Sequence, residues 1–250
     1  MQAVKLATAV GSAHNRRVAA PQAWGNRPMP SSHFRVGLIV PSSNTVMESD
    51  FHRLLGAVCA ISTSRVYLEQ VTRDAERTMI DDDLPKALRL IKTTDPHVIV
   101  FGCTSAGSLG GLQSDAGIAR RIEELTGVRA LTVVGSVVEQ LKTIQPRTVA
   151  VFTPYREELT RTVSDCVVEA GFRLGPVAGM GILSNREIGQ VAPAEIVDFV
   201  DGHMRSATAD CIFLSCTNWQ AIDAIEAVKA RFGVPVISSN QATIEAVRHS

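Results

Sequence analysis

The stretch that decides the fold is Val98-Ile99-Val100-Phe101-Gly102-Cys103-Thr104-Ser105-Ala106-Gly107, an apolar run of strand length that ends in a loop of small residues. A second stretch of the same design, Cys211-Ile212-Phe213-Leu214-Ser215-Cys216-Thr217-Asn218, begins 113 positions later. Short apolar runs bounded by turn signals indicate strands buried on both faces. Each run places a Cys-Thr pair just beyond the carboxyl end of its strand, where ligands bind in open α/β sheets. The two thiols therefore predict one site shared between two matching halves of the chain.

Strand and helix signals alternate from Phe34 onward, and the second half repeats the order of the first. Three strand–loop–helix units of the first half have counterparts in the second: Val36 with Val149, Val98 with Cys211, and Ala130 with Val236. The offsets are 113, 113 and 106 residues, which is too regular for ordinary alternation, so we infer a duplicated unit. Parallel strands joined by helical crossovers follow from the β-α-β order. The predicted fold is α/β, with two pseudo-symmetric parallel-sheet domains and the active site between them.

This pattern divides the chain into residues 1–33, 34–145 and 146–250. The first part is a basic, acid-free extension that we expect to be flexible. It is an untemplated addition, the result of a start codon assigned too early, or an import leader, and it lacks the apolar run and cleavage site of a secretory signal. The other two parts are the two α/β halves, and the C-terminal segment is expected to pack across onto the first half. A helix is expected over Leu84 to Lys92, with negative charge from Asp81, Asp82 and Asp83 at its start, where acidic side chains are favourable.

Composition excludes several classes of function. Lys plus Arg and Asp plus Glu both number 25, so the near-zero net charge removes the electrostatic case for a nucleic-acid or anionic-membrane partner. No apolar run approaches the roughly 20 residues that span a bilayer. The five cysteines are scattered, contain no Cys-x-x-Cys, and form no cluster with histidine at zinc-ligand spacing. We therefore expect a reduced, cytoplasmic protein without a metal site.

The loops that follow the predicted strands are polar but uncharged. Their residues include Ser43, Asn44, Thr104, Ser105, Tyr155, Thr217 and Asn218, together with the two thiols. Hydroxyls, amides and backbone N–H groups at helix N-termini are suitable donors for a carboxylate. No glycine motif for phosphate binding occurs, so a nucleotide cofactor is unsupported. Simpler roles are also open, since Ser and Asn commonly cap helices and a cysteine near a strand end is often a core residue.

Cysteines without a counterpart in the other half, namely Cys59, Cys166 and Cys211, are expected in the core or at the surface. The paired thiols of Cys103 and Cys216 are different, because a thiolate is a nucleophile and a base while a thiol returns a proton. We expect helix N-terminal amides to lower the pKa of both thiols below the ordinary value of about 8.5. Such a pair can remove and deliver protons on opposite faces of one planar carbon. Alternatively, one thiol adds to an activated alkene while the other protonates the neighbouring carbon. Both schemes need a pocket for the substrate carboxylate, which stabilises the carbanion as an enediolate.

Five motifs, in order, resemble those of the maleate cis-trans isomerases, which belong to the aspartate/glutamate racemase superfamily. They are Gly37–Thr45 with Met47-Glu48, Gly102–Ala106, Thr153–Tyr155, Ser184–Ile188 and Ser215–Asn218. The resemblance runs from about Phe34 to the C-terminus. It implies a cofactor-free, metal-free isomerase with two racemase-like domains around a small dicarboxylate, assembled as a homodimer or homotetramer.

The resemblance also implies roles for individual residues. Cys103 would add to C2 of maleate to give a covalent succinyl-cysteine intermediate, and Cys216 would supply and later reclaim the proton on C3. Elimination of Cys103 would then leave fumarate. The predicted carboxylate-binding set is Asn44, Tyr155 and Asn185, assisted by Ser43, Thr104, Ser105, Thr217 and Asn218.

Relatives within the superfamily supply the alternatives. Aspartate and glutamate racemases resemble this chain in their paired thiols, but they carry Gly-Cys-Thr-Glu where this chain has Ser215-Cys216-Thr217-Asn218, so an acidic partner for a substrate ammonium is missing at that position. An amino-acid or hydantoin racemase is therefore the second hypothesis. Arylmalonate decarboxylases share the Pro-Ser-Ser-Asn and tyrosine motifs but lack the first thiol, which this chain keeps as Cys103. A carboxylate-binding protein without activity would not need two thiols.

Overall fold

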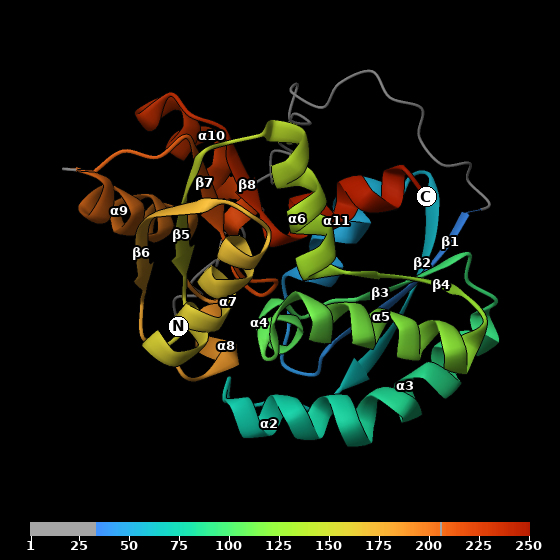
Figure 1. Ribbon diagram of the computed structural model, residues 1–250. Coiled ribbons are helices and arrows are strands. Elements are labelled where there is room, and N and C mark those ends of the chain that lie inside the picture. The colour runs from blue at the N-terminus through green and yellow to red at the C-terminus, as the bar shows by residue number, and fades with distance from the viewer. Residues whose placement is uncertain (1–33, 206) are drawn as a thin grey trace, which may run out of the picture.

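A computed structural model describes residues 34–205 and 207–250, and it shows two parallel sheets that lie side by side (Figure 1). In spatial order, the first sheet contains β2 (Cys59–Val66), β1 (Phe34–Pro41), β3 (Val98–Phe101) and β4 (Arg129–Thr132). The second contains β6 (Arg173–Gly179), β5 (Thr148–Thr153), β7 (Cys211–Leu214) and β8 (Val236–Ser238). All neighbouring strands pair in parallel. The predicted α/β fold with two parallel-sheet units is confirmed, while the basic extension, residues 1–33, lies outside the described residues.

The two sheets repeat the same strand order, and the repeat extends to the register. Val36 lies opposite Val98 in the β1–β3 pair, and Val149 lies opposite Cys211 in the β5–β7 pair. Both members of the second pair follow those of the first by 113 residues, as the spacing predicts. In each sheet the chain order reverses between the two central strands. A ligand crevice is therefore expected beyond the carboxyl ends of β1, β3, β5 and β7.

Helices follow the strands of the first half along the chain. They are α1 (Met47–Leu55), α2 (Arg73–Thr78), α3 (Leu84–Ile91), α4 (Thr104–Ser108), α5 (Gly111–Thr126) and α6 (Val133–Ile144), with a π-helical turn at Met79–Asp83 and a 3₁₀ turn at Lys92–Thr94. The predicted helix Leu84–Lys92 is present as α3, but Asp81–Asp83 lie in the π-helical turn before it and not at the start of the helical segment. The helical segment begins earlier, at Arg73, because the Thr72 hydroxyl caps it by accepting from the Ala75 N–H.

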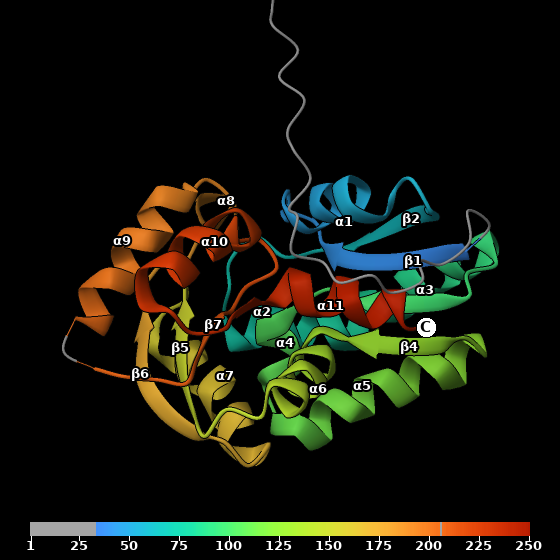
Figure 2. The ribbon, with the colours of Figure 1, turned by 90° about the horizontal axis from the view of Figure 1, so that it is seen from above.

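The second half contains α7 (Glu157–Glu169), α8 (Asn185–Ile188), α9 (Pro193–Met204), α10 (Ala221–Phe232) and α11 (Ser239–Arg248). Helix α11 packs against α1, α6 and β4 of the first half (Figure 2). The larger hydrophobic core accordingly runs through both halves and includes Leu55 of α1, Leu141 of α6 and Val247 of α11. None of the described helices has the length and apolar character that a membrane span requires.

Candidate active site

Four loops at the carboxyl ends of β1, β3, β5 and β7 carry nearly all of the predicted site residues. Ser43 and Asn44 follow β1, Cys103, Thr104 and Ser105 follow β3, Tyr155 follows β5, and Cys216, Thr217 and Asn218 follow β7, whereas Asn185 begins α8. The loops of the two halves meet directly, because the Thr217 hydroxyl donates to the Gly102 carbonyl oxygen at 3.1 Å. The fold therefore brings the predicted residues of both halves to one place, and all of them except Ser43 are buried.

Both thiols are shielded from solvent, with exposed fractions of 4% for Cys103 and 3% for Cys216. Burial is the main cause that raises the pKa of each thiol, in Cys216 to about 12, and negative charge on Glu76 raises both further. The Ala106 N–H favours the Cys103 thiolate, but its effect is smaller than that of burial. The predicted lowering of the thiol pKa values is therefore wrong, because lost hydration outweighs the helix N-terminal amides.

Tyr155 connects the two thiols. Burial raises the pKa of its hydroxyl well above the ordinary value, and the charges of Cys216 and Cys103 raise it further. The Tyr155 hydroxyl favours the thiolate of Cys216 and so lowers the pKa of that thiol, but by less than burial raises it. Charge on Cys216 in turn raises the pKa of Cys103. Such mutual effects require short separations in a low-dielectric interior, so Cys103, Cys216 and Tyr155 share one electrostatic environment.

Close packing explains the glycine before Cys103. A Cβ atom on Gly102 would lie 2.8 Å from the carbonyl oxygen of Ile39 and 2.6 Å from Sδ of Met47. The Gly102 N–H donates to that same carbonyl at 2.7 Å, which fixes the turn out of β3. A side chain at this position would push the loop away from β1, and with it the Cys103 thiol.

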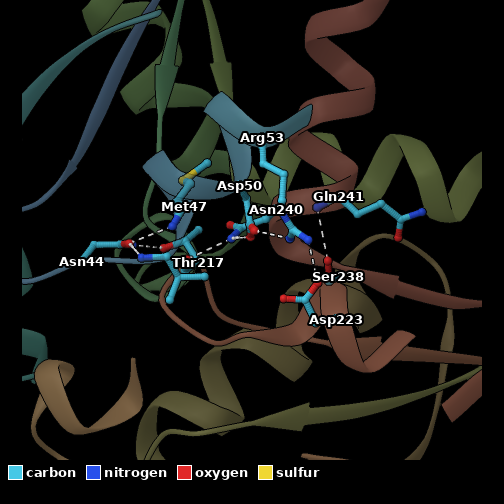
Figure 3. A network of polar contacts seen from close by, with 10 residues as sticks. Asn44, Met47, Asp50, Arg53, Thr217, Asp223, Ser238, Asn240 and Gln241 are labelled. Carbon is cyan, nitrogen blue, oxygen red and sulfur yellow. Dashed lines mark hydrogen bonds and ion pairs between the residues drawn. The ribbon is translucent and has the colours of Figure 1, made fainter. Parts of the chain in front are cut away.

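The Asn44 side chain forms hydrogen bonds both at the start of α1 and with the other half of the chain. Its Oδ1 accepts from the N–H groups of Val46 and Met47, both at 3.0 Å, and so caps the start of α1. Its Nδ2 donates to the Thr217 hydroxyl of the other half at 3.0 Å (Figure 3). Asn44 is therefore a helix cap that also reaches across to the loop that carries Cys216.

Other predicted binding residues use their side chains to join the loops. Asn185 Nδ2 donates to Ser43 Oγ at 2.8 Å. Asn218 Nδ2 donates to the Asn185 carbonyl oxygen at 2.6 Å, and its Oδ1 accepts from the Thr45 N–H at 2.8 Å. Thus both ends of the Asn218 amide form hydrogen bonds within the protein, as both ends of the Asn44 amide do. The Thr104 hydroxyl likewise donates to Ser239 Oγ at 2.9 Å.

Glu76 of α2 is the site residue that sequence reasoning missed. It is fully buried, and the Ser105 hydroxyl donates to its Oε1. Burial raises its pKa to about 8. The charged residues Arg73 and Arg77 beside it are typical of an exposed segment. The sequence feature that indicates burial is the spacing of three residues between Glu76 and the buried Met79, which places both on the same helix face.

The remaining cysteines, Cys59, Cys166 and Cys211, are buried, as expected for core residues, and each is a free thiol. Among the described residues, no group of three or more His, Cys, Asp and Glu side chains is placed to hold a metal ion.

The chain matches the model of the arylmalonate decarboxylase family over residues 36–249. It is 28% identical to a maleate isomerase from Pseudomonas putida over 227 residues, which cover 86% of this chain and 90% of the relative. It is 29% identical to an arylmalonate decarboxylase from Bordetella bronchiseptica over 208 residues, or 83% and 86% of the two chains. The crystal structure of a maleate isomerase variant from Pseudomonas putida S16 with maleate is similar at a TM-score of 0.79 and 26% identity, covering 85% of this chain and 90% of that one. These similarities confirm the predicted relationship, and the chain belongs to the arylmalonate decarboxylase family.

Proposed function

We propose that the protein is a cofactor-independent cis–trans isomerase that converts maleate to fumarate. The observation that carries the proposal is the burial of Cys103 and Cys216 at equivalent strand ends, where both interact electrostatically with Tyr155. Identity alone does not choose a reaction, because maleate isomerases and an arylmalonate decarboxylase are similar to the chain to the same degree. The second thiol favours the isomerase: addition to an alkene needs a nucleophile and a proton donor, whereas protonation of a carbanion after loss of CO₂ needs one acid.

The proposed reaction proceeds through a covalent succinyl-cysteine. The Cys103 thiolate forms a bond to C2 of maleate, and the electron pair of the double bond moves to C3 and its carboxylate as an enediolate. Cys216 gives its proton to C3, after which the C2–C3 single bond rotates. The Cys216 thiolate then takes the proton back, the double bond forms again, and the bond between sulfur and C2 breaks to release fumarate. Protons and electrons balance, so the cycle consumes no cofactor.

The proposed carboxylate donors are Asn44, Tyr155 and Asn185, and all three are buried. They are neutral donors, so their strength depends on a site that excludes water. Asn44 and Asn185 already bond to Thr217 and Ser43. We therefore expect a bound dicarboxylate to replace some of these contacts between loops.

Proton NMR of maleate mixed with the purified protein, without added metal or nucleotide, tests the proposal. We expect the vinyl signal of maleate to be replaced by that of fumarate, and no conversion with Cys103→Ser or Cys216→Ser. Wild-type protein that leaves maleate unchanged contradicts the proposal, and turnover of aspartate in preference to maleate favours a racemase. Light scattering of the same sample measures the expected homodimer or homotetramer.

The family match favours decarboxylation of an arylmalonate as a second candidate. In that reaction Cys216 would protonate the carbanion left after loss of CO₂, and Cys103 would not be needed as a nucleophile. Release of CO₂ from phenylmalonate distinguishes the two reactions. Decarboxylation that persists in Cys103→Ala, without conversion of maleate by the wild type, would replace the isomerase proposal.

A further inference from the structure

We propose that Glu76 is a further residue of the site that contacts the substrate: a carboxylic acid held neutral, whose Oε2 donates a hydrogen bond to a substrate carboxylate and to the enediolate formed when Cys103 adds. The inference rests on the proposed function, because it assigns a partner to the carboxylate of the same dicarboxylate. It places on α2, outside the four loops, a group that acts on the reacting end of the substrate.

The position of Glu76 supports this role. The Ser105 hydroxyl lies 3.8 Å from Sγ of Cys103 and also donates to Glu76 Oε1, so a single hydroxyl separates the carboxyl group from the nucleophile. Glu76 is fully buried, and its Oε2 has no hydrogen-bond partner among the described residues. A buried polar atom without a partner is unfavourable, because it has lost its hydrogen bonds to water. A ligand beside Cys103 would supply the missing partner.

The protonation state decides what Glu76 offers to a ligand. Since Oε1 accepts from Ser105, Oε2 carries the proton of the neutral acid and is the free donor. Burial raises the pKa to about 8, while the Ser105 hydrogen bond and the charge of Arg73 oppose this only in part. Arg73 is itself shared with Glu158 of α7, at 3.5 Å. Glu76 is therefore mainly neutral at pH 7.

The charged form of Glu76 would oppose the reaction. The titratable groups that face it from the surrounding loops are Cys103, Cys216 and Tyr155, and its negative charge raises the pKa of all three. An ionised Glu76 would thus disfavour the Cys103 thiolate and repel the incoming carboxylate. A neutral acid instead donates a hydrogen bond where negative charge develops, which stabilises an enediolate in a dry site.

Two variants test the inference through the pH dependence of kcat/KM for maleate. Glu76→Gln keeps a neutral donor at every pH, and Glu76→Leu keeps the size without a donor. We expect wild-type kcat/KM to stop rising above about pH 8, Glu76→Gln to keep rising there, and Glu76→Leu to lose about ten- to hundredfold at pH 7. Glu157→Gln, at an exposed position of α7, is the matched control and should keep the wild-type profile. If Glu76→Leu does not fold, the pH profiles of the wild type and Glu76→Gln alone test the role of Glu76.

Binding of succinate, which has no double bond, separates this inference from the proposed reaction. By calorimetry we expect wild-type protein to bind succinate more weakly at pH 9 than at pH 6.5, and Glu76→Gln to bind it equally at both. If the wild type makes no fumarate but binds succinate more weakly at pH 9, the proposed isomerase function is contradicted and the proposed role of Glu76 is supported. Fumarate formation with an unchanged profile in both variants overturns the role of Glu76 alone, and so does succinate binding that is absent or independent of pH in the wild type.

Discussion

Burial holds Cys103 and Cys216 in the thiol form at neutral pH, so the nucleophile must lose a proton before it can add to a substrate. The pKa of each is raised mainly by the loss of hydration, which the nearby amides and the Tyr155 hydroxyl do not offset. A thiol with a raised pKa is almost fully protonated at pH 7, so little nucleophilic thiolate is present, but its proton is available to a strongly basic carbanion. The fraction of Cys103 thiolate grows with pH, so we expect the acid side of the activity profile to rise with pH.

Substitution of each thiol separates nucleophile from proton donor. We expect Cys103→Ala to form no adduct with maleate, because it lacks the attacking sulfur. Cys216→Ala should accumulate protein that carries the mass of one maleate, because reclaiming the proton on C3 is impaired. Intact-mass spectrometry measures both. Cys166→Ala, at a buried thiol in α7, is the control, and an adduct mapped to Cys59 or Cys166 would remove Cys103 from its role.

Glu76 also links stability to pH. Its pKa rises from 4.5 to about 8 on folding, so the native state binds more protons than the unfolded state between these values. The stabilisation is complete below about pH 4.5 and is lost as pH rises through about 8, by a few kcal/mol in all. We expect the free energy of unfolding of wild type to fall relative to that of Glu76→Gln over this range. Urea denaturation at pH 4.5, 6 and 8 measures it, and a constant difference would contradict the burial of a neutral acid.

At the scale of elements, Asp115 of α5 fixes the start of α6 by hydrogen bonds. Its Oδ2 accepts from the hydroxyl of Thr132, the N-cap of α6, and from the Gly135 N–H at 3.2 Å. Asp115→Ala leaves both donors without this acceptor, and we expect a loss of about 1–3 kcal/mol in the free energy of unfolding. Chemical denaturation measures the loss. Gln113→Ala, exposed on the same helix, should change stability by less than about 0.5 kcal/mol.

Elements with a strong local signal were predicted well, and those held by long-range packing were not. The buried strands β3 and β7 begin and end where their apolar runs do. Helix α2 was missed because the segment from Arg73 to Thr78 is strongly charged, although Glu76 faces inward. The acidic residues Asp81–Asp83 looked like a helix start but lie in a π-helical turn that continues the helix from α2 into α3. A charge pattern alone did not reveal that this segment packs against α4 through the face that carries Glu76.

At the scale of the whole molecule, a polar network holds the two halves together beside the site. Asn240 of α11 donates to Asp50 Oδ2 of α1 at 2.8 Å and to the Thr217 carbonyl oxygen at 3.0 Å (Figure 3). Arg53 pairs with Asp50 at 2.6 Å and with Asp223 of α10 at 2.7 Å. Since Thr217 follows Cys216 directly, this network also positions the loop that carries the second thiol.

Asn240→Ala tests the coupling between the halves. It removes the donor to Asp50 Oδ2 and to the Thr217 carbonyl oxygen, while Arg53 still pairs with Asp50 Oδ1. We therefore expect a loss of about 1–3 kcal/mol in the free energy of unfolding and a reduced kcat for maleate. Thermal denaturation and the NMR assay measure the two effects, with Gln113→Ala as the control. Unchanged stability would show that α11 is held by its apolar contacts alone.

Removal of residues 1–30 is expected to leave activity and melting temperature unchanged. The family match begins at residue 36, and β1 begins at Phe34. The division of the chain at residue 145 is likewise a proposal, since α11 packs across it. A large loss of activity in the shortened protein would assign the extension a place in the folded structure.

The sequence by itself determined the repeated α/β order, the two Cys-Thr loops at strand ends and the family resemblance, because strand periodicity and turn chemistry are local properties of the chain. Only the tertiary structure decided that burial raises the pKa of both thiols, that Asn218 is occupied by Thr45 and Asn185, and that Glu76 lies beside Cys103. These features depend on dehydration and contacts between segments far apart in the chain. Patterns of residues that are neighbours in the sequence therefore do not predict these features.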